Sequence, residues 1–394
     1  MLAGLNLRKR ESRSRAVSIL TCVAATLVIF APGIVFIADG PSHTNENREL
    51  SDLPGRDAGW NYFESLGNFI SDRLPLRPYA VRADAWVDTH LFREDPAFGG
   101  AAIPGIITGD QGFLFLAGEV EIACAPTAPA ASTVANLAEL ARIIKASGRD
   151  VVTMVVPNKS SVHPELLPHD MADRDCFDAY VEDLWSGLAT AGIDGFFDLR
   201  TVLTRESEAT GEPLFFRTDS HWDPAGSLVA VQAMVDHFAP GLWSDEEVHD
   251  EGLVCCFGDI SMLMGAPAEE GVRSYSIVRP DVTHVSTTVI DGIVGAANRR
   301  FVNAAPDGRL ITGRTVMFLD STGLRAMAQI VPFFEDLTVI HLNDYEPQRF
   351  LDAIESSDRV WIMSVERDAP ARFELSVGSN AFRELLGQHL SQRD

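Results

Sequence analysis

From about residue 131 onward, the hydrophobic positions of the chain follow two alternating periods. Apolar residues every three or four positions predict helices, and short continuous apolar runs predict strands buried on both faces. The predicted helices span about 131–148, 176–191, 224–238, 322–334, 347–356 and 378–389. The predicted strands span about 151–156, 194–198, 213–217, 315–319, 337–341 and 359–364. Because strands that alternate with helices form parallel sheets covered on both faces, we expect an α/β fold.

Local signals define the ends of two predicted helices. Ser132 is expected to cap the first helix and Gly148 to end it. Asp223 followed by Pro224 predicts another helix start, because a carboxylate caps the free amides and proline suits the first helical position. Residues 240–312 show no helical period, so we expect an irregular or β-rich insertion there.

The first 60 residues have a different pattern. Residues 16–38 carry no charge and are long enough to cross a hydrocarbon core of ~30 Å. Five of the first fifteen residues are Lys or Arg. By the positive-inside rule we expect a cytoplasmic tail at 1–15, a transmembrane signal anchor at 16–38, a stalk at 39–60 and an extracytoplasmic domain at 61–394. A cleaved signal peptide is the alternative, which the length of the apolar run disfavours.

Composition narrows the possible functions. The 394 residues carry a formal net charge of −24, which argues against an extended nucleic-acid-binding surface. Five cysteines are too few for a disulfide scaffold, but an exported domain can hold single disulfides. Cys22 lies in the predicted span, and the other four allow three pairings. We favour Cys124 with Cys176, because the neighbours Cys255 and Cys256 pair only with strain.

Polar residues follow three of the predicted strands, where open parallel sheets collect function. His221 precedes the helix at 224–238, and Asp219 can orient its imidazole. Ser321 lies at a strand-to-helix turn, a position that exposes a nucleophile. Lys159 could hold a carbonyl or an anionic sugar. Together these residues predict an acid, a base and a hydroxyl at one sheet edge, as acyl transfer needs.

Each of these signals also has a plainer interpretation. His221 could be a solvated histidine in a capped turn, Ser321 part of an ordinary helix cap, and Lys159 a solvated lysine. Asp219, His221 and Asp223 could together ligate a metal, but Asp223 is expected to serve as the cap. We therefore predict neither a metal nor a cofactor.

Several short segments, taken in order, strengthen the first interpretation. They are Glu46-Asn47-Arg48, Asp72-Arg73-Leu74-Pro75-Leu76-Arg77, Gly112-Phe113-Leu114-Phe115, Val156-Pro157-Asn158-Lys159, Thr218-Asp219-Ser220-His221-Trp222, Gly258-Asp259-Ile260, Asp320-Ser321 and Glu366-Arg367. Over about residues 45–370 this order resembles the alginate O-acetyltransferase AlgJ/AlgX family, whose catalytic domain is SGNH-hydrolase-like. The Thr-Asp-x-His-Trp segment is the most specific part of the resemblance.

The resemblance implies an SGNH-hydrolase-like domain in circularly permuted order, since the serine follows the Asp-x-His segment. Ser321 would be the nucleophile, His221 the base and Asp219 its orienting acid. Backbone amides at the start of the helix 322–334, with that of Ser321, would stabilise the oxyanion. Further candidates for binding the substrate or the oxyanion are Asn158, Lys159, Thr322 and Arg367.

The implied function is that of a membrane-anchored, extracytoplasmic O-acetyltransferase. It would move acetyl groups to hydroxyls of an exported polysaccharide through an acetyl-serine intermediate, and a multipass membrane O-acyltransferase would supply the acetyl groups. The alternatives are an acetyl esterase with the same triad and a non-catalytic glycan-binding or assembly protein. The last is motivated by Leu319 and Thr322, where the family usually has Gly-Asp-Ser-Phe or Gly-Asp-Ser-Tyr.

Overall fold

The computed structural model describes residues 105–171, 173–264, 268–290, 297–306 and 308–391, together with Tyr62, Ser65, Leu66 and Phe69. The expected tail, anchor and stalk lie outside these residues. Within the described ranges, no helix combines the length and the apolar character that a bilayer crossing requires. The chain divides into two compact units, and the larger, Ala102–Ser261 with Pro267–Asp394, holds the predicted α/β domain.

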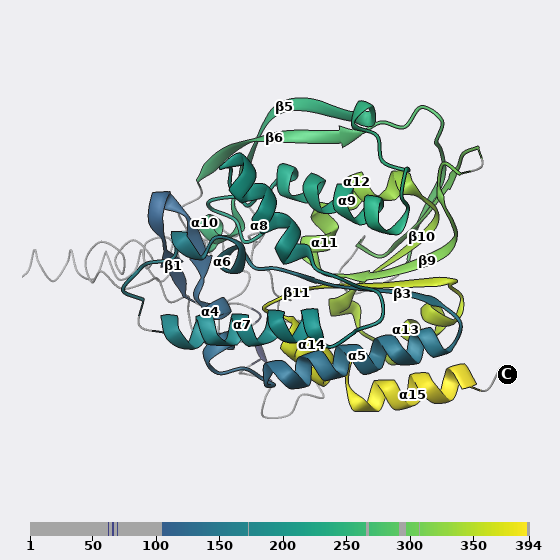
Figure 1. Ribbon diagram of the computed structural model, residues 1–394, viewed down its shortest axis with the longest axis horizontal. Coiled ribbons are helices and arrows are strands. Elements are labelled where there is room, and N and C mark those ends of the chain that lie inside the picture. Colours follow the sequence, from purple (N-terminus) through teal and green to yellow (C-terminus); the bar gives the residue numbers. More distant parts are fainter. Residues whose placement is uncertain are drawn as a thin grey trace, which may run out of the picture. The chain divides into compact units, whose positions relative to one another are not determined.

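A seven-stranded sheet forms the centre of this unit (Figure 1). Its order is β4 (Phe196–Phe197), β3 (Asp150–Val156), β11 (Arg359–Val365), β9 (Ile311–Leu319), β10 (Phe334–His341), β8 (Arg299–Ala304) and β7 (Thr283–Val289). The first five strands are parallel, as the alternating pattern predicts, but β8 pairs antiparallel with both β10 and β7. The sheet is therefore mixed, and its antiparallel part comes from the insertion at 240–312.

Helices cover both faces of the sheet (Figure 1). Those on one face are α5 (Ala130–Ala146), α7 (Arg174–Thr190), α13 (Pro347–Glu355), α14 (Ala369–Leu375) and α15 (Asn380–Ser391). Those on the other face include α8 (Leu199–Thr210), α9 (Pro224–Phe238) and α12 (Met327–Ile330). Successive side chains of β3 enter different cores, because Val155 packs on the first face and Val156 on the second.

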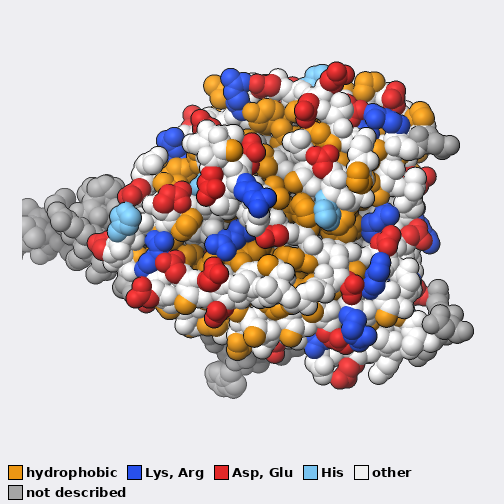
Figure 2. Space-filling model, in the orientation of Figure 1, with side chains coloured by type: hydrophobic (Ala, Val, Ile, Leu, Met, Phe, Trp, Pro, Cys, Tyr) orange, Lys and Arg blue, Asp and Glu red, His pale blue; other side chains and the backbone are white. Residues whose placement is uncertain are grey.

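Two antiparallel pairs complete the unit. The strands β1 (Ile106–Thr108) and β2 (Leu114–Leu116) flank the turn η3 (Asp110–Gly112). The pair β5 (Val248–Phe257) and β6 (Glu269–Ile277) makes up the rest of the β-rich insertion. On the face drawn in Figure 2, acidic and basic side chains are interspersed.

Some predicted elements differ from the structure. The helix α5 begins at Ala130 after Pro129, so Ser132 is not its cap. The helix expected at 322–334 is broken into α11 (Ser321–Arg325), α12 and the turn η7 (Val331–Phe333), which contains Pro332.

Three further elements differ from the prediction. The helix α8 was not predicted, because Leu199 and Leu203 are its only fully buried residues and the pattern is weak. The helix α14 was not predicted either. The strand expected at 213–217 is reduced to a single bridge between Phe215 and Trp222.

A disulfide joins Cys124 and Cys176, the pairing favoured from the sequence. Cys124 ends α4 (Ala117–Cys124) and Cys176 lies in the first turn of α7. The bond therefore joins α4 to α7, which covers one face of the sheet, and the two cysteines are 52 positions apart in the chain. Cys255 is an exposed free cysteine.

Removing this cross-link should destabilise the domain. We expect the double variant Cys124→Ala/Cys176→Ala to lose about 2–4 kcal/mol of unfolding free energy, because the unfolded chain regains the freedom of a long loop. Urea titration followed by tryptophan fluorescence measures the loss. Cys255→Ala is the matched control and should change stability by less than about 0.5 kcal/mol. Equal stabilities of the double variant and the unsubstituted chain would contradict the expectation.

Candidate active site

Lys159 fixes the loop that precedes α9. This residue begins α6 (Lys159–Val162), directly after β3, and it is buried. Its ammonium donates hydrogen bonds to the carbonyl oxygens of Phe216, Arg217 and Asp219, at 2.9, 3.2 and 2.9 Å. Burial lowers the pKa of Lys159 to about 8, and nearby carboxylates partly oppose this effect. Because all three N–H donors are taken, Lys159 holds this loop and has none left for a substrate, which corrects the expected role.

The loop held by Lys159 carries an aspartate and a histidine in contact. Asp219 Oδ1 lies 2.6 Å from His221 Nδ1 and also accepts a hydrogen bond from the backbone N–H of His221, at 2.9 Å. Both side chains are buried. After this loop, Asp223 caps α9 by accepting from the amide of Gly226 at 2.8 Å, as predicted. The cap fixes the chain direction just beyond the imidazole.

Ser321 completes this group from a different part of the chain. It begins α11 directly after β9, and its Oγ lies 3.0 Å from His221 Nε2. Since β3 and β9 are parallel strands of one sheet, the loops after their carboxyl ends meet at the same edge. The structure thus brings Asp219, His221 and Ser321 into one hydrogen-bonded row, although 100 positions separate the histidine from the serine.

A second carboxylate, Asp259, joins the group from α10 (Asp259–Leu263). Its Oδ1 accepts from the amide of Ser220 at 2.7 Å, and its Oδ2 accepts from the Ser220 hydroxyl at 2.6 Å. Asp259 Oδ2 also lies 3.4 Å from His221 Nδ1. No role was predicted for Asp259, although it lies in the segment Gly258-Asp259-Ile260, which is part of the resemblance. Only a glycine fits at 258, because an added Cβ would lie 2.0 Å from the Thr218 carbonyl oxygen.

Charges around His221 favour its protonated form. Burial alone would lower the pKa of His221, but the hydrogen bonds and charges of Asp219 and Asp259 outweigh burial and raise it. Burial alone would likewise raise the pKa of Asp259, whereas His221 and Ser220 hold it well below its usual range. The site can therefore stabilise a positive imidazole ring that has taken up a proton.

Arg325 supplies a positive charge beside the first carboxylate. Its Nη2 donates to Asp219 Oδ2 at 3.3 Å, while 47% of the arginine side chain stays exposed. The backbone N–H of Asp259 donates to the same oxygen at 3.1 Å. Arg325 was not predicted, and its place one helical turn after Ser321 is the signal that could have indicated it.

Three side chains lie close enough together to surround a cation: Asp219, His221 and Asp259. The sequence suggested Asp223 as the third possible ligand, and the structure has Asp259 there instead. The carboxylate oxygens, however, already accept hydrogen bonds from Ser220, Arg325 and backbone amides. The arrangement fits an oriented imidazole beside a hydroxyl, which is the geometry of a serine nucleophile and its base.

The chain is similar to known proteins over part of its length. Residues 106–250 match the family described as SGNH hydrolase-like domain, acetyltransferase AlgX. The chain is 24% identical over 163 residues to a probable alginate O-acetylase AlgJ of Pseudomonas syringae pv. tomato and 27% identical over 162 residues to that of Pseudomonas aeruginosa. Over these segments the chain is similar to the AlgJ/AlgX family. Each alignment covers 41% of this chain and spans about two-fifths of the relative, 39% and 38%.

Solved structures with similar folds include the O-acetyltransferase domain of Pseudomonas putida AlgJ and PatB1 of Bacillus cereus. The first has a TM-score of 0.47 at 16% identity and covers 74% of this chain and 100% of that one. The second has a TM-score of 0.48 at 11% identity and covers 67% and 96%.

Leu319 stands where the AlgJ/AlgX family pattern around the serine usually has glycine, and the structure has room for the larger side chain. The Leu319 side chain is fully buried in the core on the α9 face. Gly323 lies against it, since an added Cβ at 323 would come within 2.9 Å of both Leu319 and the sulfur of Met363. The larger side chain at 319 therefore packs into the core beneath α11, with a glycine on the helix making room for it.

The amides expected to bind the oxyanion are used differently. Asp320 caps α11, and its Oδ1 accepts from the amides of Thr322 and Gly323 at 3.0 and 3.4 Å. Its Oδ2 accepts from the amide of Val365 at 2.5 Å, and burial raises the pKa of Asp320. The expectation that the amides after Ser321 form the oxyanion hole is thus wrong, while the amide of Ser321 itself stays outside this cap.

The remaining candidates, Asn158 and Arg367, form a separate buried cluster. Asn158 Oδ1 accepts from Arg367 Nη1 at 3.4 Å, and the Asn158 amide donates to Glu366 at 2.9 Å. Arg367 Nη1 also lies 3.9 Å from Glu119. Burial raises the pKa of both glutamates. A role of Asn158, Arg367 or Thr322 in binding a substrate stays a prediction.

The bracing role of Lys159 can be tested through stability. We expect Lys159→Met to lose about 2–4 kcal/mol of unfolding free energy, because three buried carbonyls lose their donor. Urea titration measures the loss. Lys145→Met is the matched control, since that lysine is half exposed and its ion pair with Asp150 is worth little. A loss no larger than that of the control would contradict the bracing role.

The charge of Asp259 can be tested through the titration of His221. We expect Asp259→Asn to lower the pKa of His221, because a neutral amide no longer stabilises the imidazolium. Nuclear magnetic resonance of a histidine-labelled chain follows the titration. Asp281→Asn, which removes an exposed carboxylate paired with Arg309, is the control and should leave the pKa of His221 unchanged. An unchanged or higher pKa in Asp259→Asn would show that Asp259 does not act on the ring.

Proposed function

We propose that the protein is a membrane-anchored, extracytoplasmic O-acetyltransferase that moves acetyl groups to hydroxyls of an exported polysaccharide. The observation that carries this proposal is the row of hydrogen bonds from Asp219 through His221 to Ser321. The match of residues 106–250 to the AlgX SGNH hydrolase-like acetyltransferase domain and the similarity to two probable alginate O-acetylases AlgJ support acetyl transfer as the reaction.

In the first half of the proposed reaction Ser321 becomes acetylated. The carboxylates of Asp219 and Asp259 keep the proton of His221 on Nδ1, so the lone pair of Nε2 faces the Ser321 hydroxyl. Nε2 takes the hydroxyl proton as Oγ forms a bond to the acetyl carbon of the donor. The imidazolium then gives this proton to the leaving group of the donor, which departs with the electrons of the broken bond.

In the second half the acetyl group passes to the sugar. A sugar hydroxyl gives its proton to His221 Nε2 and forms a bond to the carbonyl carbon of acetyl-Ser321. The bond to Ser321 Oγ breaks, and Oγ recovers a proton from the imidazolium. In both halves the two carboxylates stabilise the positive ring, in keeping with the raised pKa of His221. Of the amides once expected to bind the oxyanion, that of Ser321 is the remaining candidate.

The sequence pattern supports a proposed location outside the cytoplasm and a membrane partner for the enzyme. The uncharged run at 16–38, preceded by basic residues, supports a signal anchor with the catalytic domain outside the cytoplasm. A multipass membrane O-acyltransferase that delivers acetyl groups from the cytoplasmic side fits this location, since the donor must reach Ser321 across the membrane.

The role of Ser321 as nucleophile has a direct test. We expect Ser321→Ala to reduce turnover of 4-nitrophenyl acetate by at least about 10³-fold, because no other group can carry the acetyl intermediate. The release of nitrophenol by the full-length chain in detergent measures this turnover. Ser356→Ala is the matched control, because this exposed serine lies at the end of α13. Turnover in Ser321→Ala equal to that in the control would reject the assigned nucleophile.

The product of the reaction distinguishes acetyl transfer to a sugar from hydrolysis of the acetyl ester. With an oligosaccharide present, we expect mass spectrometry to detect an acetylated sugar and a transient acetyl group on Ser321. Release of free acetate alone, at a rate unaffected by the sugar, would identify an acetyl esterase with the same residues. Absence of any adduct of Ser321 with a serine-directed sulfonyl fluoride would indicate a non-catalytic protein.

A further inference from the structure

A surface cavity beside α6 and α8 includes none of the residues of the proposed triad. Its volume is about 340 Å³, within the range of ~300–1,000 Å³ usual for ligand pockets. A second hollow of about 480 Å³ adjoins it, since Val162, Glu165, Thr204 and Glu208 line both. The two hollows therefore form one depression along α8.

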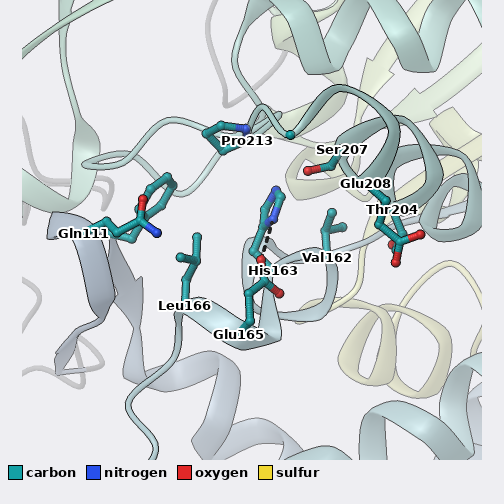
Figure 3. Close-up of a pocket in the computed structure, with 11 residues that line it drawn as sticks. Gln111, Val162, His163, Glu165, Leu166, Thr204, Ser207, Glu208 and Pro213 are labelled. Atoms are coloured by element: carbon teal, nitrogen blue, oxygen red, sulfur yellow. Dashed lines mark hydrogen bonds and ion pairs between the residues drawn. The ribbon is translucent and has the colours of Figure 1, made fainter.

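His163 is the unusual residue of this cavity. Its side chain is 95% buried, and Figure 3 shows the ring rising from the turn after α6 into the space between Leu166 and Ser207. Its Nδ1 lies 3.3 Å from Glu165 Oε1, whereas its Nε2 is buried and has no hydrogen-bond partner in the described part of the chain. Buried polar atoms almost always have a partner, so this nitrogen requires an explanation.

The protonation of the ring shows what Nε2 can bind. Burial lowers the pKa of His163, which keeps the imidazole neutral near pH 7. The Glu165 carboxylate can only accept, so the single ring proton lies on Nδ1. Nε2 therefore presents a lone pair to the cavity, and its missing partner must be a hydrogen-bond donor.

The wall formed by α8 also presents acceptors. Thr204, Ser207 and Glu208 stand at positions i, i+3 and i+4 of this helix and share one face (Figure 3). The Ser207 hydroxyl already donates to the Glu212 carbonyl at 2.9 Å, so its oxygen is left as an acceptor. A ligand of this cavity must bring donors for these acceptors, which disfavours a phosphate or carboxylate group as its main contact.

The opposite wall is apolar, with Phe113, Val162, Leu166 and Pro213. A sugar ring has the matching character, because its hydroxyls donate at the rim while its C–H face is apolar. Arg200 and Arg205 line the adjoining hollow beside four carboxylates, those of Glu165, Glu182, Asp198 and Glu208, so a net negative charge remains. Acidic and basic side chains also stand side by side over this region of the surface (Figure 2). The net negative lining disfavours an anion, and the apolar wall favours a sugar ring over a small cation.

The backbone at the rim of the cavity supports a specific role. Gln111 lines the cavity and has a φ of +56°, the one positive φ of a non-glycine residue among the described residues. Such strained conformations persist where the surroundings hold them, and they concentrate at ligand sites.

We propose that this cavity, with His163 at its floor, is a binding site for an uncharged sugar unit, whose hydroxyl donates to His163 Nε2. That this sugar belongs to the polysaccharide acceptor of the acetyl group rests on the proposed function, whereas sugar binding itself does not. The adjoining hollow then takes the next unit of the chain along α8.

The test uses the full-length chain in detergent with maltotriose and cellotriose as uncharged probes. Trigalacturonic acid and spermidine serve as the anionic and cationic comparisons, and calorimetry with saturation-transfer resonance measures binding. We expect at least one of the uncharged sugars to bind more tightly than either charged probe. Binding of neither sugar, or tighter binding of a charged probe, would overturn the proposal.

Two variants assign the binding to the cavity. We expect His163→Phe, which keeps the ring against Phe215, to weaken sugar binding about tenfold by removing the acceptor. Thr204→Tyr should block the cavity, whereas Ala209→Tyr on the exposed side of the same helix is the matched control. Sugar affinity in His163→Phe and Thr204→Tyr equal to that of the control would overturn the site.

Sugar binding and catalysis are measured separately. We expect Ser321→Ala to lose the turnover of 4-nitrophenyl acetate and to retain sugar binding. Loss of sugar binding in Ser321→Ala would indicate that the sugar binds at the triad, and it would overturn the proposal that the sugar binds in the cavity beside α8. Inactivity of the unsubstituted chain toward acetyl esters would count against the proposed function and leave the binding result to decide on the cavity.

Discussion

The geometry of the site depends on one buried positive charge. The ammonium of Lys159 gathers three carbonyl oxygens of the loop that carries Asp219 and His221. Three carbonyl groups that point at one place would repel one another without a cation among them, and the rings of Phe113 and Phe115 shield this cation from water. The lysine starts the helix after β3, so the loop is tied to the most buried part of the sheet. Any movement of the histidine relative to the sheet must first break this contact.

The serine reaches the histidine for a topological reason. In a parallel sheet the chain returns to the same edge after each crossover, so residues far apart in sequence gather there. Here β3 positions the lysine, β9 positions the serine, and the antiparallel pair β5 and β6 flanks the short helix that begins with Asp259. The insertion that interrupts the alternating pattern thus contributes a charge to the site as well as two strands to the sheet. The order of the histidine and the serine along the chain does not affect their contact, because both lie at the same edge of the sheet.

Much of the fold was predictable from local chemistry, and so was the group Asp219, His221 and Ser321. Continuous apolar runs identify the buried strands, and the pair Asp223-Pro224 identifies a helix start without any tertiary information. The antiparallel edge was not predictable, because the exposed residues of β7 give no buried face from which to read a period. Asp259 was missed because nothing near it in sequence indicates that it meets Ser220. The oxyanion amides were wrongly assigned for a related reason, since the sequence cannot tell whether Asp320 caps its own helix or leaves the amides open.

The titration of Lys159 sets an upper limit on the pH at which the site is held together, and the titration of His221 sets the lower limit of its function as a base. His221 accepts a proton only when neutral, and its neighbouring carboxylates move that condition above the ordinary imidazole value of 6.5. Lys159 offers three donors only while charged, a condition that ends near pH 8. The acidic and the basic boundary therefore belong to two side chains of a single loop assembly, and the interval between them suits both at once. A compartment whose acidity drifts away from that interval would disable the proton acceptor on one side and loosen its support on the other.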